Sequence, residues 1–242
     1  MPYFSEKLLV MHAKLLFASL LIFLTSCSET PKYPYGIAPV SDVEEYEKSI
    51  QKSPSNRFVD LENELNLARF DIRYATANNF TSEIIYPEAA AWTRIDVAKS
   101  LSQIEDSLAK HGLGLIIFDA YRPYAATVKF YQVYKDTNYV ASPYSGSRHN
   151  RGCAIDLSLY DLKTGRELQM PTKYDDFSSA AHQTTESPDS TAQYNKVFLR
   201  KVMTEFGFEV YNYEWWHFDY SGWDQYEIMD LSFAQLKSSS AD

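Results

Sequence analysis

Apolar side chains recur at helical spacing between residues 90 and 110. The positions are Val97, Leu101, Ile104 and Leu108, which are four, three and four residues apart. Side chains with this spacing share one face of an α-helix. The pattern therefore predicts an amphipathic helix over residues 90–110, and Gly112 marks its end.

A continuous apolar run follows at once, from Leu113 to Phe118. Its length and its apolar character predict a buried strand, which presents residues 119–122 at its end. Pro123 then suits the first turn of a helix that continues to about Tyr134.

The second half of the chain repeats this mixture of helix and strand. Ser190 is the predicted cap of a helix that stops at Gly207. Its apolar face is formed by Phe198, Leu199, Val202, Met203 and Phe206. Strands are predicted over residues 154–159, 208–210 and 215–218. Helices that are separate from hairpin-like strands predict a single α+β domain with a mainly antiparallel sheet and flanking helices.

The N-terminal segment has the pattern of a processing signal. Lys14 precedes an apolar run over residues 15–24, which is shorter than the ~20 residues that span a bilayer. The run has no polar face, which disfavours an ordinary amphipathic helix. Leu24-Thr25-Ser26-Cys27 resembles a bacterial lipobox. That resemblance implies a lipoprotein signal peptide over residues 1–26, with cleavage before Cys27 and lipidation of its thiol; Met1 and Met11 both remain candidate start sites.

Beyond the predicted lipid anchor, residues 27–57 are rich in proline, serine and charge and have no sustained apolar period. This composition predicts a flexible tether. The folded domain is then expected over residues 58–237, with a disordered tail over residues 238–242. An exported protein is expected, periplasmic or at the cell surface, that contacts a bacterial membrane through its lipid anchor only.

Composition narrows the class of partner. The chain has 242 residues, 45% of them hydrophobic and 15% aromatic, which is enough for one sizeable core. Its formal charge is −9; removal of residues 1–26 takes away two lysines and one glutamate and lowers the charge to −10. Such a charge speaks against nucleic acid or anionic lipid as a partner. The net charge does not speak against a small zwitterionic substrate.

The chain has two cysteines. With Cys27 assigned to lipid, Cys153 has no partner for an internal disulfide. Cys153 can in principle be a nucleophile. Its position between Gly152 and Ala154 instead favours a small buried residue with a structural role.

Two segments together offer the ligands of a catalytic zinc. One contains His149 and Asp156, and the other contains Glu214 and His217. A catalytic zinc needs three protein ligands, an open fourth position and a nearby base. We therefore predict one Zn²⁺ per chain, held by His149, Asp156 and His217, with Glu214 as the base.

The spacing of Glu214 and His217 carries a structural requirement. Side chains three residues apart on a regular strand point to opposite faces of the sheet. For both to face one metal, the segment from Glu214 to His217 must begin with a turn or carry a bulge, and bulges are common beside active sites.

These residues also carry a family resemblance. The pattern Ser-x-His-x-x-Gly-x-Ala-x-Asp at 147–156 and Glu-x-x-His at 214–217 resembles zinc D,D-peptidases that share a fold with the hedgehog signalling domain. Residues 69–76 with Asn79-Phe80, residues 119–123 and residues 170–175 resemble the VanX-type D-alanyl-D-alanine dipeptidases in the same order. The similarity runs from about Phe58 to about Phe233.

The resemblance implies roles for further residues. Arg122 matches an arginine that stabilises the tetrahedral oxyanion; the alternative for Arg122 is a surface side chain paired with Asp119. Tyr74, Ser147 and Asp175 match residues that line the dipeptide pocket. Asp175 is suited to pair with the α-ammonium of the substrate, and Ser147 can hydrogen-bond its terminal carboxylate or its amine.

Three functions follow as hypotheses. The first is zinc-dependent hydrolysis of D-Ala-D-Ala, and the second is a D,D-carboxypeptidase that trims peptidoglycan stem peptides. The third is a non-catalytic, zinc-bearing binding module like the hedgehog relatives; the presence of both Glu214 and Arg122 weighs against it. An exported dipeptidase does not reach the cytosolic precursor pool, so scavenging or recycling of D-Ala is the expected role.

Overall fold

The computed structural model describes residues 33–240, and the main folded unit begins at Tyr35. The predicted signal peptide and the predicted lipidation of Cys27 lie outside the described residues. Within the described part of the chain, no helix is both long and apolar enough to span a membrane.

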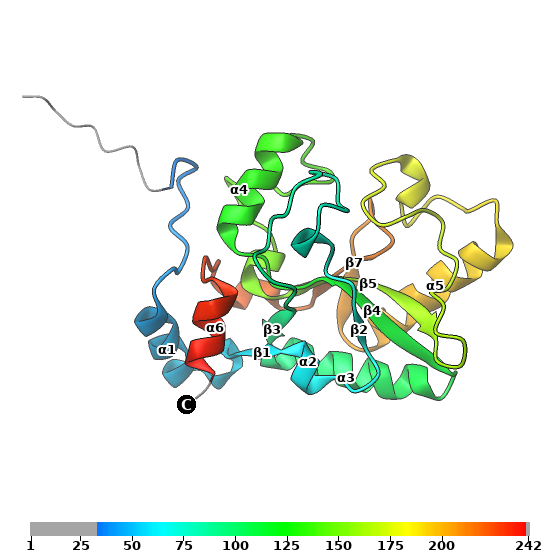
Figure 1. Cartoon of the computed structure of the whole chain (residues 1–242), viewed down its shortest axis with the longest axis horizontal. Coiled ribbons are helices and arrows are strands. Elements are labelled where there is room, and N and C mark those ends of the chain that lie inside the picture. The colour runs from blue at the N-terminus through cyan, green and yellow to red at the C-terminus, as the bar shows by residue number, and fades with distance from the viewer. Residues whose placement is uncertain (1–32, 241–242) are drawn as a thin grey trace, which may run out of the picture. The chain divides into compact units, whose positions relative to one another are not determined.

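Five strands form the central sheet, in the order β2-β4-β5-β7-β6 (Figure 1). Their bounds are β2 Arg69–Phe70, β4 Leu113–Asp119, β5 Ala154–Asp161, β6 Phe208–Val210 and β7 His217–Tyr220. Strand β2 is parallel to β4, whereas every other neighbouring pair is antiparallel. A separate antiparallel pair consists of β1 (Phe58–Asp60) and β3 (Trp92–Arg94). The α+β class with a mainly antiparallel sheet is confirmed.

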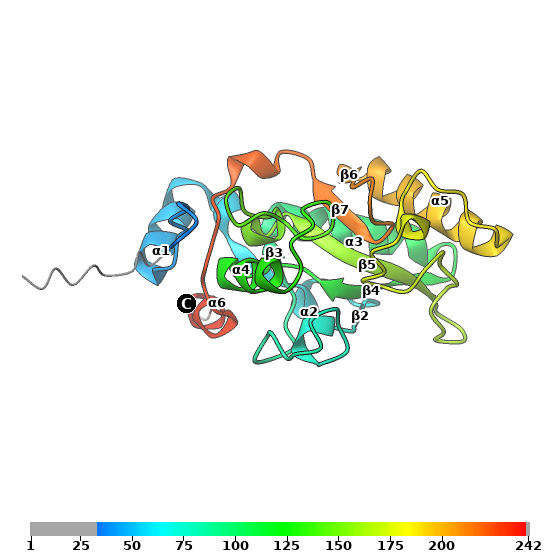
Figure 2. The same ribbon diagram turned by 90° about the horizontal axis from the view of Figure 1, so that it is seen from above.

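Six α-helices surround these strands in the described residues (Figures 1 and 2). They are α1 Val43–Lys52, α2 Leu61–Glu64, α3 Ile95–Ala109, α4 Tyr124–Val133, α5 Ser190–Glu205 and α6 Phe233–Ser239. Short 3₁₀ turns occur at Pro54–Asn56, Arg73–Ala75, His149–Arg151, Ser179–Ala181 and Trp223–Gln225. Helix α5 leads directly into β6, and Gly207 ends it in the left-handed conformation (φ 87°), as predicted.

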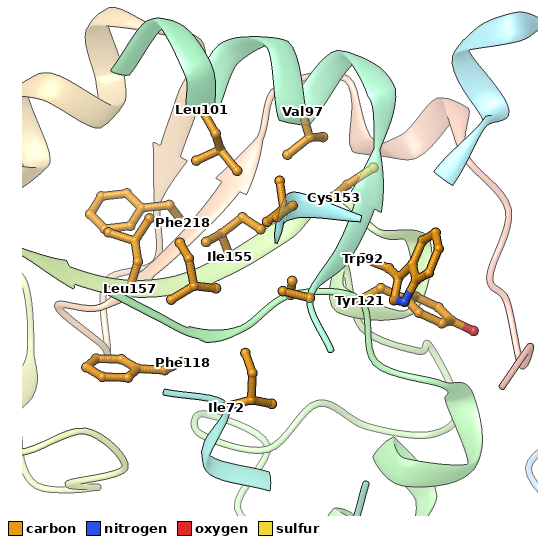
Figure 3. Close-up of a cluster of buried hydrophobic side chains, with 14 of the residues drawn as sticks. Ile72, Trp92, Val97, Leu101, Phe118, Tyr121, Cys153, Ile155, Leu157 and Phe218 are labelled. Atoms are coloured by element: carbon orange, nitrogen blue, oxygen red, sulfur yellow. The ribbon is translucent and has the colours of Figure 1, made fainter. Parts of the chain in front are cut away.

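Helix α3 covers one face of the sheet. Figure 3 shows Val97 and Leu101 of α3 directed toward Ile155 of β5 and Phe218 of β7. These four side chains are fully buried, and each contributes roughly 1.5–3 kcal/mol by leaving water. Because side chains alternate along a strand, the neighbours of Ile155 and Phe218 face the opposite side of the sheet. That side carries the polar site.

Two sequence predictions about helix starts are wrong. The predicted helix over residues 90–110 begins only at Ile95, because residues 92–94 form β3 and pair with β1. That pairing joins segments over thirty residues apart, which helical periodicity does not detect. Asp189, rather than Ser190, caps α5, because its carboxylate accepts hydrogen bonds from the backbone N–H groups of Thr191 and Ala192.

The predicted flexible tether is also wrong for most of its length. Val40 pairs with the backbone around Met229, and α1 follows from residue 43. Tyr46 on α1 is buried, and its hydroxyl accepts a hydrogen bond from the backbone N–H of Phe58. One buried aromatic among charged residues is too weak a periodic signal to predict this helix. At the other end, α6 extends to Ser239, so the predicted disordered tail is helical over residues 238–239.

Candidate active site

Strand pairing places three acidic or imidazole side chains in one row across the sheet. Asp119 on β4 lies opposite Asp156 on β5, and Asp156 lies opposite His217 on β7. Directly opposed residues on antiparallel strands project from the same face. The row therefore lies on the face opposite α3, with Asp156 at its centre.

His149 joins this row from the turn before β5. Gly152 ends that turn in the left-handed conformation (φ 69°), which a residue with a side chain adopts only under strain. The imidazole Nδ1 of His149 donates to the carbonyl oxygen of Ala120 at 2.6 Å, which directs Nε2 toward the row. The chain thus turns back at Gly152 and brings His149 beside Asp156.

Three predicted metal ligands converge at this point. Nε2 of His149 lies 3.4 Å from Oδ1 of Asp156 and 3.2 Å from Nδ1 of His217. The Asp156 Oδ1 to His217 Nδ1 distance is 2.9 Å. All three ligand atoms lie within 4.8 Å of one another, so together they could hold a metal ion. Two nitrogens and one carboxylate oxygen, all buried, are a donor set that fits zinc.

Further side chains hold the ligands in place, and sequence reasoning missed them. Asp219 accepts a hydrogen bond from Nε2 of His217 at 3.0 Å, and Tyr174 donates to Oδ2 of Asp156 at 2.9 Å. Such partners fix the orientation and tautomer of metal ligands. The sequence could have pointed to Asp219, because it lies two residues after His217 and residues two apart on a strand share a face.

The buried charges shift one another's pKa. Burial raises the pKa of Asp156, but the two nearby imidazoles outweigh it and hold that pKa well below its usual range. Burial lowers the pKa of His217, yet Asp219 and Asp156 raise it well above the ordinary value. A carboxylate that is held ionised is ready to bind a cation.

Glu214 lies in a turn rather than in the strand. Its backbone N–H bonds to the carbonyl of Tyr211, and β7 begins only at His217, so the strand predicted at residues 215–218 starts two residues later. Of the two predicted alternatives, a turn or a bulge, the structure has the turn. Oε2 of Glu214 lies 3.8 Å from Nδ1 of His217. Burial raises the pKa of Glu214 well above its ordinary value, which suits a group that takes up and returns a proton.

A buried amide and a buried ammonium brace this turn. Nε2 of Gln183 donates to the carbonyl oxygens of Glu214 and Trp215, each at 3.3 Å. The ammonium of Lys196 on α5 donates to the carbonyls of His182, Gln183 and Thr185. Helix α5 therefore holds the segment that supports Glu214. No sequence signal pointed to either side chain.

Arg122 forms the ion pair of one predicted alternative and lines the cavity as the other requires. It pairs with Asp119, as the alternative held, through Nε at 3.0 Å and Nη2 at 2.7 Å from the same carboxylate oxygen. It is not on the surface, however, because only 7% of it is exposed and Nη2 lies 3.9 Å from Oδ2 of Asp156. Its guanidinium packs over the ring of Phe130 at 4.7 Å. The ion pair and the ring fix Arg122 beside the ligands.

A cavity of about 310 Å³ opens onto the ligands. All eight side chains predicted for the site within the domain line it: Tyr74, Arg122, Ser147, His149, Asp156, Asp175, Glu214 and His217. Asp175 adopts the left-handed conformation (φ 60°), and its carboxylate accepts a hydrogen bond from the hydroxyl of Tyr74 at 3.1 Å. Burial, assisted by the charge of Asp156, raises the pKa of Asp175 to about 7.

Cys153 does not belong to this cavity. It is fully buried and packs on the α3 side of the sheet (Figure 3), and burial raises the pKa of its thiol to about 12. A thiol that stays protonated is a poor nucleophile. The burial of Cys153 therefore supports its predicted structural role.

Comparison with known proteins places this constellation in a family. Residues 54–235 match the peptidase M15 family, described as D-ala-D-ala dipeptidase. A D-alanyl-D-alanine dipeptidase of Escherichia coli is 34% identical over 164 residues, covering 68% of this chain and 84% of the relative. Another from Enterococcus faecalis is 31% identical over 183 residues, covering 67% of this chain and 91% of the relative.

Among solved structures, the vancomycin resistance D,D-dipeptidase VanXYg in complex with a D-Ala-D-Ala phosphinate analogue is 22% identical, with a TM-score of 0.35. It covers 68% of this chain, and the match covers 66% of that structure. The family match spans nearly all of the folded unit and includes every residue of the cavity. The chain is a member of the peptidase M15 family of D-ala-D-ala dipeptidases and is a metallopeptidase by that membership.

Proposed function

We propose that this protein hydrolyses the peptide bond of the dipeptide D-Ala-D-Ala and releases two molecules of D-alanine. One observation carries the proposal: three side chains that could hold a metal ion, a buried carboxylate and a buried guanidinium line a single cavity. Relatives that are 31–34% identical carry this activity in their names. The cavity volume of about 310 Å³ suits a small substrate.

The proposed cofactor is one zinc ion, held by Nε2 of His149, Oδ1 of Asp156 and Nδ1 of His217. Three protein ligands and an open position are typical of catalytic zinc sites. A zinc ion in such a site polarises a carbonyl group and acidifies water. Asp219 and the carbonyl of Ala120 keep both imidazoles in the tautomers that expose these nitrogens.

Glu214 is the proposed general base and acid. Its carboxylate takes a proton from the attacking water as the new C–O bond forms, and it gives this proton to the amine as the C–N bond breaks. Arg122 is the proposed oxyanion donor. Asp119 holds its guanidinium rigidly, so its remaining N–H groups can stabilise the negative charge on the carbonyl oxygen.

The substrate's α-ammonium is proposed to bind Asp175. The carboxylate of Asp175 accepts hydrogen bonds from the hydroxyl of Tyr74 at 3.1 Å and from the backbone N–H of Phe80 at 3.4 Å. An acylated or longer peptide has no ammonium at this point and would leave the carboxylate without a counter-charge, which is costly in a buried place. The arrangement therefore favours a free dipeptide over a stem peptide.

The test is to assay the purified protein on D-Ala-D-Ala, L-Ala-L-Ala, N-acetyl-D-Ala-D-Ala and a stem pentapeptide. Rapid release of D-alanine from the free D,D-dipeptide alone is the expected result. A faster reaction with the pentapeptide would replace the dipeptidase proposal with the D,D-carboxypeptidase. Metal-loaded protein that cleaves none of the four would favour the non-catalytic binding module.

We also propose that the protein is exported and anchored to a bacterial membrane by a lipid on Cys27. The apolar run and the lipobox-like sequence at residues 15–27 support this location. The proposed role is then scavenging or recycling of D-Ala from outside the cytoplasm. In this role, the protein contacts the membrane only through its anchor and does not bind nucleic acid.

A further inference from the structure

Arg148 has no part in the proposed mechanism, yet it lines the same cavity. It immediately precedes His149, and its guanidinium lies over the ring of Trp223 at 4.6 Å. Its Nε is buried and has no hydrogen-bond partner, since the nearest carboxylate oxygen, on Asp219, is 3.7 Å away. The accessible part of the side chain is therefore the terminal end of the guanidinium, which makes no hydrogen bond to the described residues.

Arg148 is one of two arginines among the residues that line the cavity, and no lysine lines it. The other, Arg122, already directs two of its nitrogens to one carboxylate oxygen of Asp119. The guanidinium of Arg148 makes no hydrogen bond of this kind, and 43% of its side chain remains accessible. Among the described residues Asp219, at 3.7 Å from Nε, is its one ion-pair partner, so the terminal N–H groups of Arg148 remain available to a ligand.

The charges of a dipeptide require such a cation. A zwitterion brings one ammonium and one carboxylate into a cavity whose wall already includes Asp156, Asp175 and Glu214. Asp175 provides for the ammonium. The proposed zinc ion and Arg122 act on the reacting carbonyl group, so the incoming carboxylate needs a further cation away from these acidic groups.

We propose that Arg148 binds the C-terminal carboxylate of the substrate and so selects peptides with a free C-terminus; this inference rests on the proposed dipeptidase function. A guanidinium presents paired N–H donors that match the two oxygens of a carboxylate. The ring of Trp223 holds the plane of the guanidinium, while Asp219 limits its movement. Asp175 and Arg148 both line the cavity, so the two side chains can face the two ends of one dipeptide.

The experiment compares D-Ala-D-Ala with D-alanyl-D-alaninamide, which lacks the terminal negative charge. In the wild type, kcat/KM should be at least about tenfold higher for the free acid. Arg148→Gln should lower this value for the acid by roughly 10- to 100-fold, mainly through KM, and should lower it much less for the amide. Arg148→Lys, which keeps the charge, should recover part of the preference.

Arg151→Gln is the matched control. Arg151 also packs over Trp223, at 5.4 Å, but it does not line the cavity and donates to the carbonyl of Tyr226 instead. Its substitution should leave the ratio of acid to amide as in the wild type. A change in that ratio as large as that of Arg148→Gln would overturn the proposal.

Two further outcomes would also overturn it, in distinguishable ways. If Arg148→Gln lowers kcat/KM equally for both substrates and the protein loses zinc, Arg148 acts through Asp219 on His217 and does not bind the carboxylate. If the zinc-loaded wild type cleaves neither substrate, the dipeptidase function itself is wrong, and the inference is lost with it.

Discussion

At the residue scale, Asp175, the proposed partner of the substrate's ammonium, lowers the stability of the folded protein. Its backbone is left-handed, a conformation that asparagine and aspartate tolerate better than most residues. Its folded pKa of about 7 lies above the ordinary value of an aspartate, so folding favours the protonated form. Above pH 7, the ionised carboxylate therefore opposes folding until an ammonium pairs with it.

Asp175→Asn separates binding from stability. The variant should raise the Tm at pH 8, where the wild type carries the unfavourable charge, and should raise it less at pH 5. Its KM for D-Ala-D-Ala should increase at least tenfold at pH 8, because the ammonium loses its partner. The wild-type KM should also increase as the pH falls through about 7, whereas that of the variant should not. A Tm at pH 8 below that of the wild type would contradict this account.

Glu214 is the residue on which turnover is expected to depend most. Glu214→Gln keeps the shape of the side chain but cannot take up a proton. Its kcat should fall by about 10²-fold or more, the lower end of what general acid–base groups contribute. Zinc content, measured by metal analysis of the purified variant, should stay near one per chain, because Glu214 is not among the ligands. Activity within a few-fold of the wild type would remove Glu214 from the mechanism.

At the element scale, the site depends on how β5, β7 and α5 meet. The pairing of β5 with β7 brings Asp156 against His217, and α5 supports the turn before β7 through Lys196 and Gln183. Lys196 is 1% exposed and faces carbonyl oxygens rather than a carboxylate. Burial lowers its pKa. Its ammonium thus serves as an internal clamp on residues 182–185.

Lys196→Met should loosen that clamp. The apolar chain fills the space but leaves buried carbonyl oxygens unsatisfied, at a cost of about 1–3 kcal/mol in the free energy of unfolding. Because residues 182–185 support Glu214, kcat should fall roughly tenfold while zinc content is kept. Lys201→Met on the same helix is the control, since Lys201 is exposed and should change neither quantity. Equal effects of the two substitutions would exclude the clamp.

At the scale of the whole molecule, the folded unit begins far earlier than its composition suggests. Helix α1 packs against α6 (Figure 1). The backbone of Val40 forms hydrogen bonds with the backbone of Ile228 and Asp230. Eight residue steps separate Cys27 from Tyr35, which span roughly 30 Å at most when extended. A lipid on Cys27 would therefore hold the domain close to the membrane surface.

Two changes test this arrangement. Removing residues 35–57 should lower the Tm of the protein markedly, because Tyr46 leaves the core, whereas a true tether would be dispensable.

Cys27→Ser should prevent lipid attachment and shift the protein from the membrane fraction to the soluble fraction. Wild-type protein recovered from the cytosol would contradict the proposed location, and an unchanged Tm after the deletion would contradict the role of α1.

The sequence by itself determined what depends on local chemistry. Gly207 ends α5 because it adopts a positive φ, and the apolar run at residues 113–118 becomes β4 because it has no polar face. Eight of the residues that line the cavity could be predicted because their chemical types and spacing match those of a known family. The need for a turn or a bulge at Glu214 followed from the period of a strand alone.

Only the tertiary structure decided which distant residues meet. Asp119, Asp156 and His217 form a row because β5 pairs with both β4 and β7, and because the register of β4 shifts between Ile117 and Asp119. A change of one residue in these registers would turn a side chain to the other face. The roles of Gln183 and Lys196, the strand β3 and the attachment of α1 could not be predicted for the same reason. Each depends on contacts between segments far apart in the chain or on burial, and neither follows from local pattern.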